Sequence, residues 1–555
     1  MTHLPILARK GLSFARREAS KLNPATLARR RRHDRLRAET ETYLAGLHLE
    51  DVEPFAGRVA VDAMFDNPNY WMRFAMFRAA AGLSGVQEVA LLGPYNRKRI
   101  GRTLERFGTA RTCDFLALGR RQHEAKAISD DLLQQTHTPG DILNWSLPED
   151  VPASFFYDGI LRRQRAAVAD INDPRFPGIV TEAVSAILAA REFLDTEKPD
   201  MLVLSHHFDF RWSALVWMGF ARGIPSYLLF GNYGVLKPCQ MSRPDDIYDF
   251  YDHPLPADID HAEGELEAGG RGARLQQLGR RYMEMRLSGH TTDLGAVYAF
   301  QSAADETTTR DSICGQLGWD KDLPIVALYV GNWWDNIHGL GMTNFRDLED
   351  WLHCLLPVIR GHRAVNWLIK GHPADRWYGG TTLDDVIPGD LESHIHIVSD
   401  TLNNADIIEI ADACVTIHGT AGVEFAARGK PVLLADCGWY DDCGLALRCN
   451  SRAEFLERLT REWWHELDLE RIRRRAEIFA GLCYGCPDWQ GSLIFRPDTD
   501  RDDIYQDQLA LLRAHPEVLT RELRMLADWV GQSEPFYHRY KMRLANGFAL
   551  PDEAA

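Results

Sequence analysis

The stretch PIVALYV at residues 324–330 decides the fold class expected for this 555-residue chain. It is a short, uninterrupted apolar run, and similar runs follow it, each separated from the next by a segment with a helical pattern. They are NWLIK at 366–370, HIHIV at 394–398, ACVTI at 413–417 and PVLL at 431–434. Short apolar runs that alternate with helices are typical of a parallel sheet buried on both faces. We therefore predict a parallel α/β domain in this part of the chain.

The first half of the chain carries a second series of such runs. They are RVAVDA at 58–63, EVALL at 88–92, MLVLS at 201–205 and SYLLF at 226–230. The halves also share one unit, FARGIP at 220–225 and AARGKP at 426–431, in which Gly ends a helix and Pro begins the next strand. Two series of this kind imply two α/β domains. The polar segment 245–274 predicts a surface excursion between them, and a helical pattern follows residue 450.

Composition and charge exclude several classes of protein. The residues are 45% hydrophobic and 26% charged, as in ordinary globular domains. No apolar run approaches the ~18 residues of a membrane span. The net charge of −16 argues against a protein that binds nucleic acid over its surface, and no nucleic-acid partner is expected. Ten cysteines are too few for a disulfide scaffold, so we expect a reducing, cytoplasmic location.

The first 40 residues form a basic segment. They hold eleven Lys/Arg against three Asp/Glu, a charge of +8, which leaves −24 for the remainder. One interpretation is a solvated basic arm. The other is a short amphipathic helix, with Leu4, Ile6 and Phe14 among its apolar residues, that lies on an anionic membrane surface. The second interpretation makes the protein peripheral at the inner face of the cytoplasmic membrane.

Polar residues follow the strands of the second series, at the ends where parallel sheets bind their ligands. Lysine suits a phosphate charge, and histidine can donate to a phosphate oxygen or titrate. The turn at 418–420 is small enough for backbone N–H groups at a helix start to face a phosphate, and Glu424 follows within the first helical turn. A surface loop and a charge paired with the helix dipole are the structural alternatives. The predicted binding set is Lys370, His372, His418, Gly419, Thr420 and Glu424.

Three motifs carry a resemblance to a known family: KGHP at 370–373, HGTAGVE at 418–424 and GKP at 429–431. They resemble the nucleotide-sugar half of bacterial surface and capsular polysaccharide glycosyltransferases related to Kdo transferases, and more remotely that of bacterial sialyltransferases. The resemblance implies a GT-B-like α/β fold, with two facing Rossmann-like domains, a deep interdomain cleft and a helical C-terminal tail. It also implies that a nucleotide sugar, CMP-linked, is the substrate, and that no cofactor or metal is needed.

The resemblance implies residue roles and domain limits as well. The donor nucleotide would be bound by Lys370, His372, Thr420 and Glu424. The expected domains are a basic arm or helix over residues 1–50, a Rossmann-like acceptor domain over 51–310, a Rossmann-like nucleotide-sugar-binding domain over 311–490 and a helical tail over 491–555.

The expected function is glycosyl transfer. A sugar, Kdo or a related acidic sugar, would move from its nucleotide to a surface polysaccharide, capsule or lipopolysaccharide acceptor. The alternatives are a transferase of phosphate-linked polyols and a non-catalytic nucleotide-sugar-binding protein of surface glycan assembly. A binding module alone would not need His and Asp at the strand ends of both halves.

The segment SHHFD at 205–209 supplies the candidate acid/base residues. Glycosyl transfer needs a group that takes the proton of the acceptor hydroxyl, and Asp or His at a strand end can serve. Asp209 is the first candidate and His206 the second. In the structural alternative, Asp209 caps a helix that begins near Arg211.

The segment GNWWDNIHG at 331–339 combines aromatic rings with polar groups, a combination that suits sugar recognition. A Trp-rich packing patch between domains is the alternative. The predicted sugar or acceptor residues are Trp334, Asp335, His338 and, after a first-half strand, Asn232. The CxxC of Cys483 and Cys486 has no second pair to complete a zinc set, so no metal site is expected.

Overall fold

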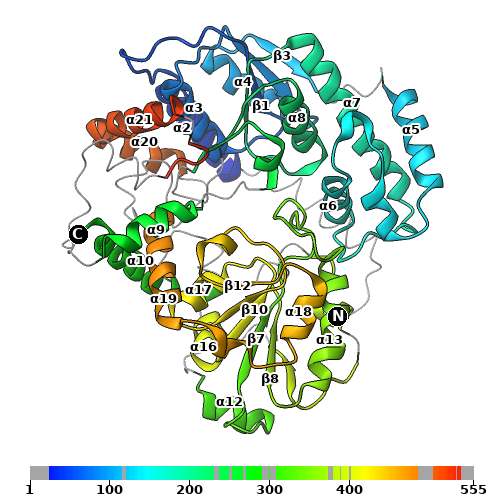
Figure 1. The fold of residues 1–555 in the computed structure, drawn as a ribbon. Helices are drawn as coiled ribbons and strands as arrows, with labels where there is room; N and C mark the ends of the chain where they lie inside the picture. Colours follow the sequence, from blue (N-terminus) through cyan, green and yellow to red (C-terminus); the bar gives the residue numbers. More distant parts are fainter. Residues whose placement is uncertain are drawn as a thin grey trace.

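Two α/β domains, each built on a six-stranded sheet, make up the computed structural model of the chain (Figure 1). The structure describes residues 24–115, 121–229, 237–248, 253–266, 270–289, 299–300, 308–372, 375, 379–387, 389–398, 402–484, 504–532 and 534–538. The described helices include none that is long and apolar enough to cross a membrane.

The first sheet has the strand order β3-β2-β1-β4-β5-β6. Its strands are β1 (Val59–Ala63), β2 (Glu88–Leu92), β3 (Arg111–Asp114), β4 (Met201–Leu204), β5 (Ser226–Leu228) and β6 (Cys239–Met241). Only the edge strand β6 runs antiparallel to its neighbour. Alternate side chains of the central strands enter cores on opposite faces: Val59 and Val61 contribute to one, and Ala60 to the other.

The second sheet is parallel throughout and has the order β12-β11-β10-β7-β8-β9. Its strands are β7 (Ile325–Tyr329), β8 (Asn366–Lys370), β9 (Ile395–Ile397), β10 (Ala413–Thr416), β11 (Val432–Leu434) and β12 (Leu447–Arg448). Counted within the domain, the order is again 3-2-1-4-5-6, the doubly wound arrangement of Rossmann-like sheets. The expected α/β fold class with two Rossmann-like domains is confirmed.

Helices of the first domain cover both faces of its sheet. They are α3 (Pro68–Ala80), α4 (Arg97–Phe107), α5 (Gln122–Gln134), α6 (Ala153–Gln164), α7 (Phe176–Glu197) and α8 (Asp209–Ala221), with short 3-10 turns η2 (Pro139–Asn144), η3 (Pro148–Asp150) and η4 (Pro244–Tyr248). Helix α6 packs tightly on α8, because a Cβ at Gly159 would lie 2.2 Å from the Phe210 ring. This packing holds α6 at the face that meets the second domain.

The two ends of the described chain come together on the first domain. Helix α2 (Pro24–Ala45) packs against α20 (Ile504–Ala514), and α21 (Pro516–Val530) packs against α3, so the last helices return to the start of the chain (Figure 1). Phe536 then forms a bridge with Cys239 of β6. The expected helical tail therefore contributes buried side chains, Trp529 among them, to the core of the first domain.

Helices α9 (Pro256–Gly264) and α10 (Arg271–Leu287) belong to the core of the second domain. Their segment was expected to be a polar surface excursion, which is wrong for α9, because Ile259 and Ala262 are buried. Helix α10 lies directly on α19 (Leu469–Tyr484): a Cβ at Gly279 would stand 1.7 Å from the carbonyl oxygen of Glu477. Other elements of this domain are α12 (Arg310–Leu317), α13 (Leu348–Gly361), α15 (Leu383–Val386), α16 (Asn404–Ile410), α17 (Ala421–Ala427), η5 (Asp441–Cys443), α18 (Arg452–Arg458) and η6 (Trp463–Glu466).

Candidate functional site

The reversal of strand order places the candidate site at the centre of each sheet. In a doubly wound sheet, the crevice for ligands opens where neighbouring strands are followed by connections to opposite sides. In the first sheet this point lies between β1 and β4, which are followed by Met64 and Ser205. In the second it lies between β7 and β10, and His418 comes two residues after β10.

Contacts across the domain boundary bring these two points together. The Phe208 ring lies 3.5 Å from the position that a Cβ on Gly339 would take. Arg162 of α6 forms an ion pair with Asp335 of the second domain, with Nη2 and Oδ1 2.7 Å apart. Burial lowers the pKa values of His206, His372 and His418, and the Asp335 charge opposes this effect at each of them. The charge of Asp335 therefore acts on histidines of both domains.

In the first domain, a chain of hydrogen bonds orients His206. The Ser205 hydroxyl donates to Oδ2 of buried Asp62 at 2.5 Å, and the Trp212 indole N–H donates to the same oxygen at 2.8 Å. Ser205 Oγ lies 2.6 Å from His206 Nδ1. Because the serine proton is directed to Asp62, the bond to His206 requires an N–H at Nδ1. The lone pair of the neutral ring is therefore on Nε2.

Burial keeps the His206 ring neutral. It lowers the pKa of His206 to about 4, against the opposing effect of the Asp62 carboxylate. The ring also packs on Trp212 with their centroids 4.4 Å apart. An imidazole held with an unprotonated Nε2 is ready to accept a proton from a hydroxyl.

Asp209, the first candidate for the proton acceptor, forms a buried ion pair. It is the first residue of α8, with a left-handed φ of 73°, and Arg163 Nη1 lies 2.5 Å from its Oδ2. Burial alone would raise the pKa of Asp209, but Arg163, Arg211 and Arg162 outweigh it, and the pKa lies below its usual value. The expected start of the helix near Arg211 is thus two residues late. Arg163 donates to both carboxylate oxygens of Asp209, so Asp209 would have to leave this ion pair to take a proton, which favours His206.

In the second domain, the turn after β10 holds His418 next to a rigid backbone. Its Nδ1 is buried and has no hydrogen-bond partner in the described part of the chain. Burial lowers the pKa of His418 to about 4, against the carboxylates of Asp436, Asp158 and Asp335. The Tyr440 hydroxyl donates to the Gly419 carbonyl at 2.8 Å and fixes the turn.

Thr420 occupies the N-cap position of α17 but makes no side-chain capping bond. Its hydroxyl is therefore not committed to the helix backbone.

Lys370 and His372, the residues of the KGHP motif, differ in their surroundings. Lys370 is buried, and its Nζ donates to the Leu402 carbonyl at 2.9 Å, a bond that ties the end of β8 to the loop before α16. His372 is exposed to solvent on one side. Burial of the ring by the surrounding protein lowers the pKa of His372, and the charge of Asp335 opposes this effect.

Glu424 lies in a buried ion pair that the sequence did not indicate. Its Oε1 accepts from Arg286 Nε of α10 at 2.8 Å, and both side chains are almost fully buried. The pair joins α17 to α10. This contact supports a structural role for Glu424 rather than the expected role as a ribose acceptor.

The GNWWDNIHG segment is one of the contacts between the domains as well as a set of site residues. Trp334 packs under the guanidinium of Arg162, 5.9 Å from the ring centroid. The carboxylate of Asp158 on α6 accepts three N–H groups from the segment: His338 Nδ1 at 2.7 Å, His338 N at 2.9 Å and Gly339 N at 3.1 Å. Asn232 lies outside the described residues. In the described part of the chain, no group of His, Cys, Asp and Glu could hold a metal ion.

Three important residues were absent from the predicted set: Asp62, Asp158 and Arg162. The sequence contained a signal for Asp62, because it is the one acidic residue within the run RVAVDA. Asp158 and Arg162 lie on a helix with no motif, and their partners are in the other domain.

Solved structures share a likeness with this chain, but known sequence families do not. No protein-family model matches the chain, and no curated protein sequence matches it. Among solved structures, a beta Kdo 2,4 transferase, KpsC of Thermosulfurimonas dismutans, is 13% identical with a TM-score of 0.29, over 50% of this chain and 78% of that one. The UDP-GlcNAc 2-epimerase of Neisseria meningitidis is 10% identical with a TM-score of 0.26, over 77% and 97%. The spinosyn rhamnosyltransferase SpnG is 10% identical with a TM-score of 0.25, over 77% and 96%. These likenesses carry no argument about the site.

The buried pair of Glu424 and Arg286 gives the first prediction. Glu424→Ala leaves a buried guanidinium without its carboxylate and should lower the free energy of unfolding by about 3–5 kcal/mol. Urea denaturation measures the change. Glu409→Ala, at an exposed position of the same domain, serves as control and should change stability by less than about 0.5 kcal/mol. Equal stability of the two variants would contradict the structural role.

The neutral histidines predict a loss of stability in mild acid. Burial lowers the pKa of His206 and His418 to about 4 and that of His207 to about 3. Unfolded rings titrate near 6.5, so between these values the unfolded chain binds more protons than the native one. The free energy of unfolding should therefore fall from pH 7 to pH 5 by roughly 2 kcal/mol per ring.

The test is urea denaturation at both pH values, with the His418→Asn variant for comparison. Because that variant has lost one titrating ring, its stability should fall by less over the same interval. A stability that stays constant or rises toward pH 5 would refute the assignment of neutral rings.

Proposed function

We propose that the chain transfers a glycosyl group from a nucleotide sugar to a hydroxyl acceptor at the boundary between its two domains. The observation that carries this proposal is the meeting of two Rossmann-like switch points, each with a neutral histidine, His206 on one side and His418 on the other. Ligands of doubly wound sheets bind at such points, and two facing points suit a reaction between two substrates.

The second domain is the proposed donor side. His418 Nδ1 has no hydrogen-bond partner among the described residues, and an N–H at this atom would donate to a phosphate oxygen of the donor. His372 could donate to the same leaving phosphate. Lys370 would act there mainly by holding the loop at Leu402 in place. The KGHP and HGT motifs support a CMP-linked donor of Kdo or a related acidic sugar, with a surface polysaccharide as acceptor.

The first domain is the proposed source of the base. The acceptor hydroxyl would give its proton to His206 Nε2 as its oxygen bonds to the anomeric carbon. At the same time the bond from that carbon to the phosphate oxygen breaks, and its electron pair leaves with the nucleotide. Asp62 would stabilise the resulting imidazolium through Ser205. Trp334 and Asp335, beside Arg162 at the boundary, would contact the sugar.

The base assignment predicts the effect of His206→Gln. Glutamine cannot take the proton, so turnover should fall at least ~100-fold while donor affinity is unchanged. Turnover of the parent should also decline as the pH falls toward 4, where His206 becomes protonated. Donor binding by calorimetry and single-turnover rates provide the measurements.

His362→Gln, a histidine bonded to the Leu459 carbonyl in the second domain, is the matched control. Normal turnover in His206→Gln together with a large loss in Asp209→Asn would transfer the role to Asp209.

The donor assignment is tested by a hydrolysis screen with CMP-, UDP- and CDP-linked compounds. A CMP-linked acidic sugar should be cleaved fastest, and His418→Ala should reduce its rate by about 10²–10³-fold, as the loss of one group that stabilises the leaving phosphate does. Preferred cleavage of a CDP-linked polyol would instead indicate the polyol-phosphate transferase. Binding without cleavage of any compound would indicate a binding protein.

A further inference from the structure

Helices α2 and α4 join two basic segments into one surface. The exposed basic side chains of α2 are Arg29, Arg30, Arg31, Arg32 and Arg35, and those of α4 are Arg97, Lys98, Arg99 and Arg102. The two helices pack against each other although more than 50 residues separate them in sequence. The sequence showed the basic residues of α2 as part of a basic arm. Only the fold brings the basic residues of α4 next to them.

A buried network fixes this helix pair. Arg37 of α2 donates to both oxygens of Asp66, at 2.9 and 2.7 Å, and its Nε lies 2.6 Å from Glu41 Oε1. Thr103 of α4 donates to the same Glu41 oxygen at 2.9 Å. Asp66 and Glu41 are thus already bonded to buried partners. The basic side chains on the outer surface are held in place on a rigid support.

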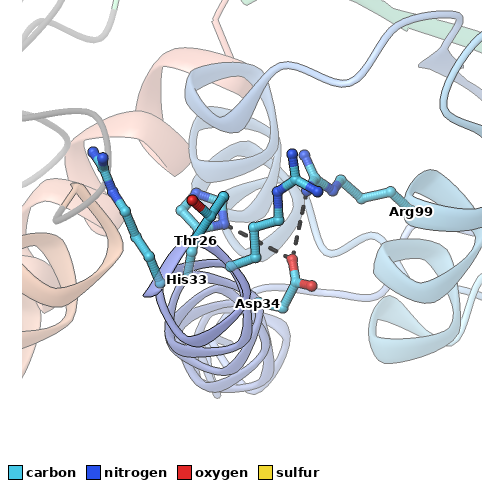
Figure 2. Close-up of a pocket in the computed structure, with 6 residues that line it drawn as sticks. Thr26, His33, Asp34 and Arg99 are labelled. Atoms are coloured by element: carbon cyan, nitrogen blue, oxygen red, sulfur yellow. Dashed lines mark hydrogen bonds and ion pairs between the residues drawn. The ribbon is translucent and has the colours of Figure 1, made fainter. Parts of the chain in front are cut away.

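A cavity of about 340 Å³ opens in this surface, lined by Thr26, Arg29, Arg30, His33, Asp34 and Arg99. Figure 2 shows Asp34 between Arg99, which reaches over from α4, and His33 of α2. Arg99 lies 3.5 Å from Asp34, at an exposed position. One carboxylate therefore faces three arginines. Burial and Arg99 lower the pKa of His33 despite Asp34, as expected where the local potential is positive.

The charge of the rest of the chain favours one orientation of the protein on an anionic surface. Residues beyond the first 40 carry −24 in total, so most of the molecule repels a polyanion. Figure 1 places α4 on the side of the first domain away from the second sheet. A planar anionic surface can touch this side alone and avoid the acidic remainder.

Exposed apolar side chains accompany the basic ones. Tyr95, two residues before α4, is 71% exposed, and Leu27 of α2 is 37% exposed. Tyrosine and leucine next to arginines match the boundary between lipid headgroups and acyl chains. A nucleic acid would gain nothing from an exposed leucine.

We propose that the α2–α4 surface docks the protein on an anionic phospholipid bilayer, with lipid phosphodiester groups bound by the arginines around the cavity. The first domain, which supplies the proposed acceptor side, then faces the membrane. The proposal does not depend on the proposed function, since it rests only on the charge and shape of this surface.

The test measures binding of the full chain to vesicles of phosphatidylcholine with 30% phosphatidylglycerol, by flotation at low and high salt. Lys98→Glu/Arg102→Glu reverses two exposed charges on α4. At ~1 kcal/mol per near-surface cation, binding should weaken at least about tenfold. Arg30→Glu/Arg31→Glu on α2 should have a similar effect, and high salt should weaken binding of the parent.

The matched control is Lys321→Glu/Arg363→Glu, which makes the same change of charge on exposed positions of the second domain. It should bind the vesicles like the parent. Deletion of residues 1–40 is unsuitable, because it removes Arg37 and Thr40 from the core. Thermal unfolding confirms that each variant is folded.

Three results would overturn the proposal: equal binding by the α4 variant and the control, equal binding of the parent to vesicles with and without phosphatidylglycerol, or tighter binding to a single-stranded oligonucleotide than to vesicles. Rates of donor hydrolysis in solution separate this proposal from the proposed function. They should be the same for the α4 variant and the parent, whichever way the vesicle experiment ends.

Discussion

The carboxylate of Asp158 is the constraint on which the relation of the two domains depends. It is buried, and it accepts three N–H groups from His338 and Gly339 of the other domain. A buried carboxylate that lacked these donors would strongly destabilise the folded state. The three hydrogen bonds form only when α6 meets the GNWWDNIHG segment in this one arrangement. The same arrangement places Arg162 beside Asp335 and brings the strand ends of both sheets together.

Charged and neutral groups have separate roles around the meeting point of the domains. Asp209 with Arg163, and Glu424 with Arg286, are ion pairs that hold helices in place. His206 and His418 are neutral because burial lowers their pKa values. A neutral imidazole can accept or donate a proton without first breaking an ion pair. The chemistry proposed for the site therefore depends on the rings, and its geometry depends on the pairs.

The path of the chain makes each domain a composite of distant segments. The last described helices complete the core of the first domain, and α9 and α10 complete that of the second. Close helix contacts such as that at Gly279 leave no room for a side chain. These additions explain why domain limits drawn along the sequence do not coincide with the cores.

The sequence by itself determined the two sheets, because a strand buried on both faces must be apolar, and runs such as PIVALYV have no other stable place. It missed β3, β6 and β12, since edge strands can be polar or very short. It also located the strand ends at His206 and His418. Only the tertiary structure decided which carboxylates are held in buried ion pairs and which remain available for chemistry. The partner of a buried charge can come from any segment: Arg163 lies 46 residues from Asp209, and Arg286 lies 138 residues from Glu424. No local pattern specifies such a pair, because it forms only when the chain has folded and water has left the space between its members.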